Sequence, residues 1–254
     1  MLKLSQSLGV NTERKAFNNF SIAFEGTDDY IDCGDSDELS FGNGTTDSPF
    51  SISLWVKLST VGSIQGLISK INSGNSEYFM KFHTDDYIWL RLFDSDDGGK
   101  IGVKTTGINF AINTWYHVVA TYDGTDDKAG LNIYVDADDL TSRTSSGTYN
   151  SMSNTSAPLT LGVQQSTSQY LNGKLDEVTL WNVELSAAQV SRLYNTGNPI
   201  DPRGISLPAS NLAGYWRMGD DSVYDTIIDS SEDDNNGTMT NMQAVDIVTD
   251  VAQS

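Results

Sequence analysis

Short runs of alternating apolar and polar residues, each bounded by Gly, Asp, Asn or Ser, recur along most of this chain. In the segment FSISLWVKL (50–58), every second residue from Phe50 to Val56 is apolar, so these side chains fall on one face of an extended chain. This period is typical of a half-buried strand in an antiparallel sheet. We predict strands at residues 20–24, 30–33, 50–58, 66–71, 78–82, 87–93, 115–123, 131–136, 159–163 and 174–181.

The acidic residues support a strand-and-loop chain. The sequence contains 27 Asp but only 7 Glu. Glu favours helices, whereas Asp competes with the backbone for hydrogen bonds, favours turns and offers short oxygen ligands to cations. The bias therefore indicates a loop-rich β protein.

One segment, LSAAQVSRLYNTG (185–197), has helical spacing instead. Ser186 and Gln189 form a capping-box pattern, and Gly197 is placed to end the helix. We predict one short helix at 186–196, lying across the edge of a sandwich. Together with the strands it gives an all-β fold of two antiparallel sheets in a jelly-roll sandwich.

Charge excludes two classes of partner. Lys and Arg total 15 against 34 Asp and Glu, a net charge of −19. Such a surface repels phosphates and anionic headgroups, so we expect neither a nucleic acid nor a membrane surface as a partner. No run is long enough to span a bilayer, and the first twenty residues lack the apolar centre of a signal peptide, so neither membrane insertion nor secretion by the usual signal is expected. Cys33 has no cysteine partner and is expected to be a small buried side chain.

The ordered segments resemble a known family. These are FEGTDDYIDCGD (24–35), FSISLWVKL (50–58), WYHVVATYDG (115–124) and LNGKLDEVTLWNVELSAAQVSRLYNTG (171–197). Together they look like the laminin G-like, concanavalin A-like lectin/glucanase jelly roll, over about residues 20–200.

Residues 212–241, LAGYWRMGDDSVYDTIIDSSEDDNNGTMTN, resemble the segment that usually opens such a module. They either close the same sandwich in a rearranged order or begin a second copy. Closure is favoured because the remaining residues are too few for another sandwich. The expected organisation is an N-terminal arm (1–19), the sandwich (20–240) and a C-terminal tail (241–254).

The sequence predicts no enzyme. Glucanases of the resembled superfamily carry a strand motif ExDxxE, which is absent here. Asp176 and Glu177 are neighbours on a predicted strand, so they should point to opposite faces and could not flank one glycosidic bond. His83 and His117 lie in strand patterns without a neighbouring Ser or Cys motif.

A calcium site is implied by the resemblance. Modules of this family often hold one structural Ca²⁺ through the DDY turn, the TYD strand end and the DEV strand, which here supply Asp29, Asp123 and Asp176. Converging carboxylates would repel one another unless a hard cation neutralised them. In the alternative, Asp29 and Asp123 cap turns and Asp176 accepts a hydrogen bond from a neighbouring strand.

Aromatic residues are the candidates for sugar contacts. Trp55, Trp115, Trp181 and Trp216 lie in predicted strands or at strand ends and are expected in the core. Four other rings lie nearer to loops and are candidate ligand contacts: Tyr87, Trp89, Tyr149 and Tyr170.

Two functions remain open. The short polar arm and the absent signal peptide are similar to those of stand-alone jelly rolls in bacteriophage structural proteins. This predicts a virion structural or adhesive protein, such as a capsid decoration or tail component, whose partners are other virion proteins or copies of itself. The alternative is a carbohydrate-binding module of a bacterial surface or secreted protein, with an extracellular or cell-surface location and a glycan partner.

Overall fold

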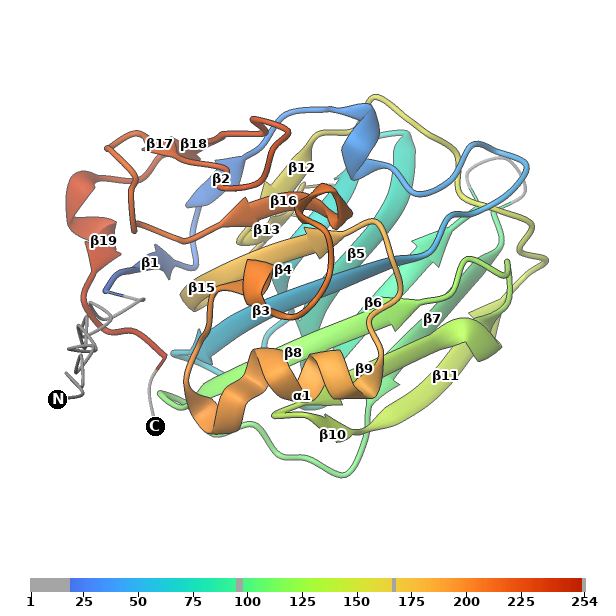
Figure 1. Cartoon of the computed structure of the whole chain (residues 1–254), viewed down its shortest axis with the longest axis horizontal. Helices are drawn as coiled ribbons and strands as arrows, with labels where there is room; N and C mark the ends of the chain where they lie inside the picture. Colours follow the sequence, from blue (N-terminus) through green and yellow to red (C-terminus); the bar gives the residue numbers. More distant parts are fainter. Residues whose placement is uncertain (1–18, 95–97, 166–167, 253–254) are drawn as a thin grey trace, which may run out of the picture.

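The alternating strands pair into two antiparallel sheets that pack face to face (Figure 1). The computed structural model describes residues 19–94, 98–165 and 168–252. Within them, the predicted all-β sandwich with one short α-helix is confirmed. The predicted N-terminal arm lies outside the described residues except for Asn19.

The sheet nearer the viewer in Figure 1 is called the front sheet. In spatial order, its described strands are β10 (Asp138–Asp139), β9 (Leu131–Val135), β8 (Trp115–Tyr122), β3 (Phe50–Leu58), β15 (Asn172–Trp181), β1 (Ser21–Glu25) and β19 (Ile247–Val248). Strand β16 (Leu212–Trp216) also pairs with β15.

The back sheet lies behind it. Its described strands, in spatial order, are β11 (Thr141–Ser146), β7 (Lys100–Thr105), β6 (Tyr87–Phe93), β5 (Asn75–His83), β4 (Gln65–Asn72), β12 (Leu159–Leu161), β2 (Tyr30–Asp32), β18 (Gly237–Thr240) and β17 (Thr226–Ile227). A separate hairpin consists of β13 (Val163–Gln164) and β14 (Gln169–Tyr170). Short 3₁₀ turns occur at Asp37–Leu39, Lys128–Gly130, Asn195–Gly197, Pro202–Gly204, Ala209–Asn211 and Ala244–Asp246.

The main core lies between the sheets. Alternate residues of the facing strands fill it, such as Ile52 and Leu54 of β3 and Leu90 of β6, all fully buried. Cys33 is buried in this core, as predicted. Three of the four tryptophans expected in the core are buried, but Trp115 is only partly so, because its side chain lies on the outer side of the front sheet beside Lys57.

Helix α1 (Ala187–Tyr194) begins as its sequence predicts. The Ser186 side chain accepts a hydrogen bond from the Gln189 N–H, and the Gln189 side chain accepts one from the Ser186 N–H. Val190 and Leu193 pack against the outer side of the front sheet. The helix ends at Asn195, which has a left-handed φ of 44°, two residues before the predicted Gly197.

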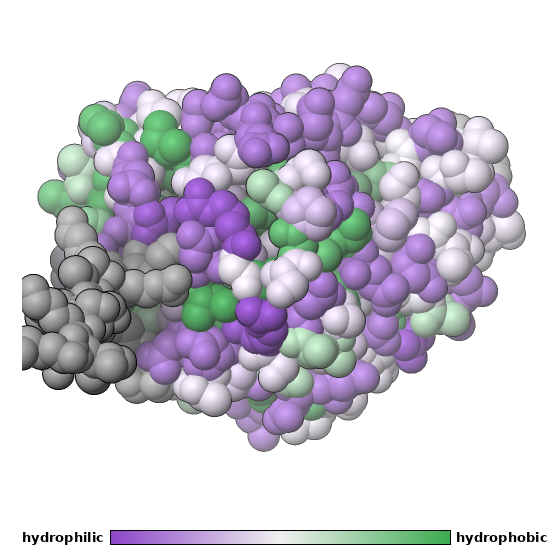
Figure 2. Space-filling view, viewed as in Figure 1, coloured by the Kyte–Doolittle hydropathy of each residue, from purple (hydrophilic) through white to green (hydrophobic). Residues whose placement is uncertain are grey.

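The surface on this side is mainly hydrophilic (Figure 2). Helix α1 and the segment after it therefore cover the apolar outer side of the front sheet.

Among the described residues, no helix has the length and apolar composition needed to cross a bilayer.

The segment after α1 closes the same sandwich, which confirms the favoured interpretation. Strand β16 pairs with β15 of the front sheet, and β18 pairs with β2 of the back sheet. The described part of residues 241–254 is not a free tail, because β19 pairs with β1 and the Asp250 carboxylate accepts hydrogen bonds from Lys57 Nζ at 2.9 and 3.0 Å. The two-residue strand β19 is too short to show an alternating pattern.

Candidate functional site

Strands β5, β6 and β7 are consecutive neighbours in the back sheet, and their two faces differ in chemistry. On β6 every second residue, including Leu90, is buried in the core, so the remaining side chains point away from it. Residues opposite one another on paired strands share a face, which extends the same outer set to β5 and β7. We call this set the cationic-aromatic face: Phe79, Lys81, His83, Tyr87, Trp89, Arg91, Phe93, Lys100, Gly102 and Lys104.

The rings of the cationic-aromatic face touch one another across the strands. His83 stacks on Tyr87 with 4.6 Å between ring centroids and an angle of 6° between the planes. Trp89 meets Tyr87 at 6.3 Å and Phe79 at 5.8 Å, both in edge-to-face geometry. Aromatic rings are therefore in continuous contact across β5 and β6, with Phe79 buried and the other three partly exposed.

Each positive side chain of the face lies over one of these rings. The Arg91 guanidinium carbon is 3.9 Å from the Trp89 ring centroid, and Lys104 Nζ is 4.7 Å from that of Tyr87. Lys81 and Lys100 approach Phe79 and Phe93 in the same way, at 4.5 and 5.7 Å. Cation–π attraction therefore fixes the positions of the charges beside the rings.

Gly102 makes room for the indole of Trp89. A Cβ at position 102 would lie 2.9 Å from Trp89 Nε1 and 2.6 Å from the Leu90 carbonyl oxygen. Both contacts are too close, so any larger residue would displace the Trp89 ring from β7. Glycine at this outward position thus belongs to the local structure of the face.

The β13–β14 hairpin borders the face at Lys81. Lys81 Nζ donates hydrogen bonds to Gln164 Oε1 at 3.0 Å and Gln169 Oε1 at 3.2 Å. Burial, and secondarily the nearby Arg91 charge, lower the pKa of Lys81 to about 8. Tyr170, a predicted ligand contact, follows Gln169 on β14 and is half-buried.

The predicted ligand contacts separate into two groups. Tyr87 and Trp89 lie together on the cationic-aromatic face, with Tyr170 on the bordering hairpin. Tyr149 lies elsewhere, in the loop that precedes β12, and its hydroxyl donates to the carboxylate of Asp47, which precedes β3. This hydrogen bond joins the two loops, and a ligand contact at Tyr149 stays a prediction.

The cations and the other rings of the face were not among the residues predicted from the sequence. The sequence nevertheless indicates them. In YIWLRLF (87–93) the residues that alternate with the apolar core positions are all aromatic or basic. The outward side chains of β5, β6 and β7 form one surface only when these strands are neighbours, and β7 was not among the predicted strands.

The three predicted calcium ligands are not brought together. Asp29 accepts the Glu25 N–H at 3.0 Å, and Asp123 accepts the Thr125 N–H at 3.0 Å. These turns lie at opposite ends of the front sheet, separated by the length of β3, roughly 27 Å at about 3.4 Å per residue. Asp176 lies between them in β15 and accepts the Ala252 N–H at 3.3 Å. The alternative of capping and hydrogen bonding fits these positions, with Ala252 in place of a neighbouring strand.

Asp29 belongs to another cluster of carboxylates. Within the described residues, Glu25, Asp28 and Asp29 offer oxygens that all lie within 4.8 Å of one another at the β1–β2 turn. The Asp29 charge, followed by burial and Asp28, raises the pKa of Glu25, and burial raises that of Asp29. Carboxylates that raise one another's pKa form a donor set that suits a hard cation such as Ca²⁺.

If this group binds Ca²⁺, saturating Ca²⁺ should raise the melting temperature of chelator-treated protein by several degrees, because a ligand at a hundredfold excess over Kd adds about 2.7 kcal/mol. Asp28→Asn should abolish that shift, since it removes one carboxylate of the three. Asp123→Asn, in the turn at the other end of the sheet, is the control and should keep it. Scanning calorimetry with and without Ca²⁺ measures the change in melting temperature. An equal Ca²⁺-induced change in Asp28→Asn and Asp123→Asn would rule out this site.

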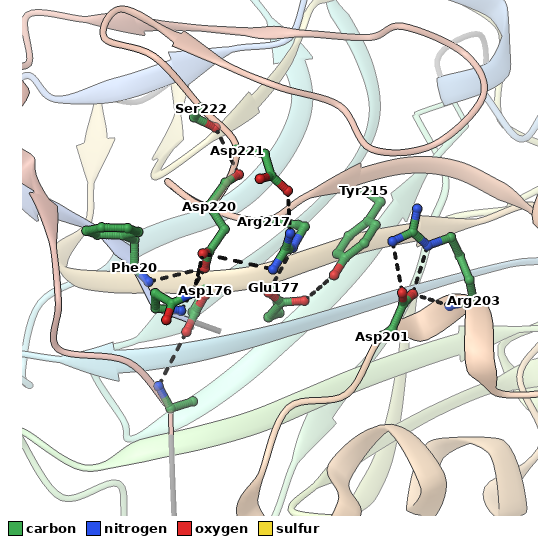
Figure 3. A network of polar contacts seen from close by, with 12 residues as sticks. Phe20, Asp176, Glu177, Asp201, Arg203, Tyr215, Arg217, Asp220, Asp221 and Ser222 are labelled. Atoms are coloured by element: carbon green, nitrogen blue, oxygen red, sulfur yellow. Dashed lines mark hydrogen bonds and ion pairs between the residues drawn. The ribbon is translucent and has the colours of Figure 1, made fainter. Parts of the chain in front are cut away.

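Asp176 and Glu177 do not point to opposite faces as predicted. The pairing of β15 with β3 shifts by one residue between Asp176 and Thr179, and Glu177 has a φ of 44°, so a β-bulge places both carboxylates on the outer face (Figure 3). Glu177 accepts a hydrogen bond from the Tyr215 hydroxyl, and Arg217 Nε lies 3.8 Å from its other oxygen. Burial, and then Asp176, raises the pKa of Glu177 well above its usual range.

This carboxylate pair is closed to a sugar. Asp176 is fully buried and Glu177 is 5% exposed. The cavity beside Glu177 holds about 10 Å³, which is enough for one water molecule. The pair therefore cannot act on a glycosidic bond in this conformation.

A buried Ser–His pair lines the same cavity, although the sequence shows no Ser near either histidine. Ser53 Oγ lies 2.8 Å from His117 Nε2 across β3 and β8. Burial lowers the pKa of His117 to about 3, and its Nδ1 has no hydrogen-bond partner among the described residues. Without a group that orients the ring, this pair lacks the third member of a catalytic triad.

Comparisons with known proteins agree on the fold. The family model described as concanavalin A-like lectin/glucanases superfamily matches residues 25–191. No curated protein sequence matches the chain.

Two solved structures illustrate the likeness. A candidate carbohydrate binding protein from Bacteroides ovatus aligns with a TM-score of 0.58 and 19% identity, over 93% of this chain and 62% of that one. The chain thus spans less than two thirds of that protein. The native heptameric SAP-like pentraxin of Limulus polyphemus aligns with a TM-score of 0.48 and 14% identity, over 70% of this chain and 82% of that one.

Proposed function

Because this chain belongs to the concanavalin A-like lectin/glucanases superfamily, we propose that it is a carbohydrate-binding module that holds glycan on the cationic-aromatic face. The observation that carries the proposal is the run of partly exposed rings His83, Tyr87 and Trp89 beside fixed hydrogen-bond donors. Sugar rings present apolar C–H surfaces and polar hydroxyls, and a binding site needs both kinds of partner.

The proposed module binds without cleaving. The cationic-aromatic face has no carboxylate among its members, whereas glycoside hydrolysis needs two, about 5 to 9.5 Å apart. The adjacent carboxylates Asp176 and Glu177 are buried on the outer side of the other sheet, and the group of Glu25, Asp28 and Asp29 lies at the β1–β2 turn, away from the face.

A glycan-binding role favours an extracellular or bacterial cell-surface location. The Bacteroides ovatus protein of similar fold supports the choice of ligand class, since its description names carbohydrate. The virion role predicted from the sequence gains no support from the family match or the solved structures, and it stays a prediction.

Binding to a panel of immobilised oligo- and polysaccharides tests the proposal. Trp89→Ala should weaken binding at least tenfold, because it removes the ring at the centre of the face, and a ring contact is worth roughly 1.5 kcal/mol. Tyr224→Ala removes an exposed ring far from the face and is the control. Wild-type protein that binds no glycan, or Trp89→Ala that binds normally, would reject the proposal, and released reducing sugar would reject its non-catalytic part.

A further inference from the structure

The cationic-aromatic face contrasts in charge with the rest of the chain. The whole chain carries −19, yet this face contains Lys81, Arg91, Lys100 and Lys104 and no acidic member. Among the described residues, acidic side chains lie at its rim: Asp85 Oδ2 is 3.4 Å from His83 Nδ1, Asp86 lines a pocket with Lys104, and Asp94 lies beside Lys100. A local positive field therefore exists on a protein that otherwise repels anions.

These cations differ from others in the described chain in what holds them. Five of the other described cations pair with a carboxylate within 4.0 Å: Lys57, Lys70, Lys174, Arg203 and Arg217. Three more donate hydrogen bonds to neutral oxygens: Lys128, Arg143 and Arg192. The four cations of the face pair with no carboxylate among the described residues and lie over aromatic rings instead. Their charges are held in place without being neutralised.

The unneutralised charges of the face lower the stability of the folded chain. Burial lowers the pKa of both Lys81 and Arg91, and the Arg91 charge lowers the pKa of Lys81 further. Positive groups held close together in partly buried positions are typical of sites that receive a negative ligand. A bound anion would remove the mutual repulsion.

From this arrangement, and resting on the proposed function, we infer that the glycan is a polyanionic polysaccharide bearing carboxylates or sulfates. Lys100 and Lys104 are four residues apart on β7, roughly 14 Å at about 3.4 Å per residue, and Arg91 lies on the next strand. The positive charges are thus repeated along the sheet. A polymer with repeated negative groups can meet several of them while its rings lie on Trp89 and Tyr87.

Binding measured by calorimetry on the full chain tests the inference with three probes: polygalacturonate for carboxylates, dextran sulfate for sulfates and unmodified dextran as the neutral polymer. We expect at least one anionic polymer to bind tenfold or more tightly than dextran, and its affinity to fall with added NaCl. Lys100→Gln with Lys104→Gln should reduce that affinity at least tenfold. The charge-matched control, Lys128→Gln with Arg192→Gln, removes two cations outside the face and should change it less than twofold.

The outcomes separate this inference from the proposed function. If neutral glycans bind through Trp89 as well as anionic ones, and the double variant is unaffected, the polyanion inference fails while the proposed function stands. If no glycan of any kind binds, both fail. Binding of a single-stranded oligonucleotide more tightly than either polymer would also overturn the inference, because the anion would then not be a glycan.

Discussion

Acidification from pH 7 to pH 4 should cost about 3 kcal/mol of folding free energy through His117 alone. His117 is 1% exposed, and burial lowers its pKa from 6.5 to about 3. Between these values the unfolded chain binds a proton that the folded chain does not, so the free energy of unfolding falls as the pH falls, by about 1.4 kcal/mol per unit. The contribution is complete above pH 6.5 and is lost progressively toward pH 3.

Other groups make the folded state more stable as the pH falls, so the contribution of His117 must be measured as the difference between the wild type and a variant. The raised pKa of Glu177 favours the folded state at low pH, and acid also reduces the repulsion within a chain of net charge −19. In urea unfolding at pH 7 and pH 4, His117→Gln should lose about 3 kcal/mol less than the wild type. The control His83→Gln, at a partly exposed position, should match the wild type.

A direct measurement covers the case in which His117→Gln does not fold. The imidazole NMR signals of His117 should stay in the neutral form at pH 5. Signals of a protonated ring at that pH in folded protein would show that burial does not suppress its charge and would overturn the prediction.

Asp229→Ala should destabilise the protein by on the order of 4 kcal/mol. The Asp229 carboxylate is 4% exposed and accepts the N–H groups of Tyr215 at 2.8 Å, Ser231 at 2.9 Å and Asn235 at 2.9 Å. Alanine would leave the Tyr215 and Asn235 donors buried without an acceptor, at about 1 to 3 kcal/mol each, and would also remove the bonds to Ser231. These bonds join β16 to the loop before β18.

Urea unfolding of the variant provides the measurement. Asp233→Ala changes an exposed side chain in the same loop and should stay within about 0.5 kcal/mol of the wild type. A loss below 1 kcal/mol for Asp229→Ala would mean that the buried donors find other partners, and that the closing segment does not depend on this carboxylate.

The fold class could be predicted because the alternation of apolar and polar residues indicates which side chains of a strand are buried. In β3 and β6 the apolar residues of the alternating pattern are the ones that face the core. The predicted bounds 50–58 and 87–93 match the strands. Local capping likewise predicted the start of α1, since Ser186 and Gln189 meet within one turn. Both signals lie within a few residues of what they specify.

The candidate sites depend on contacts between distant parts of the chain. Asp29 and Asp123 were matched by motif, yet the strand register places their turns at opposite ends of the front sheet. Glu177 turns to the same face as Asp176 because pairing with β3 forces a bulge there, which no local rule for neighbouring strand residues predicts.

The cationic-aromatic face combines both levels. The sequence by itself determined which residues of β6 point outward, because a strand alternates its side chains whatever its neighbours are. Only the tertiary structure decided that Lys81 and Lys104 flank Trp89, because the order of strands in a sheet is set by how the whole sandwich closes its core.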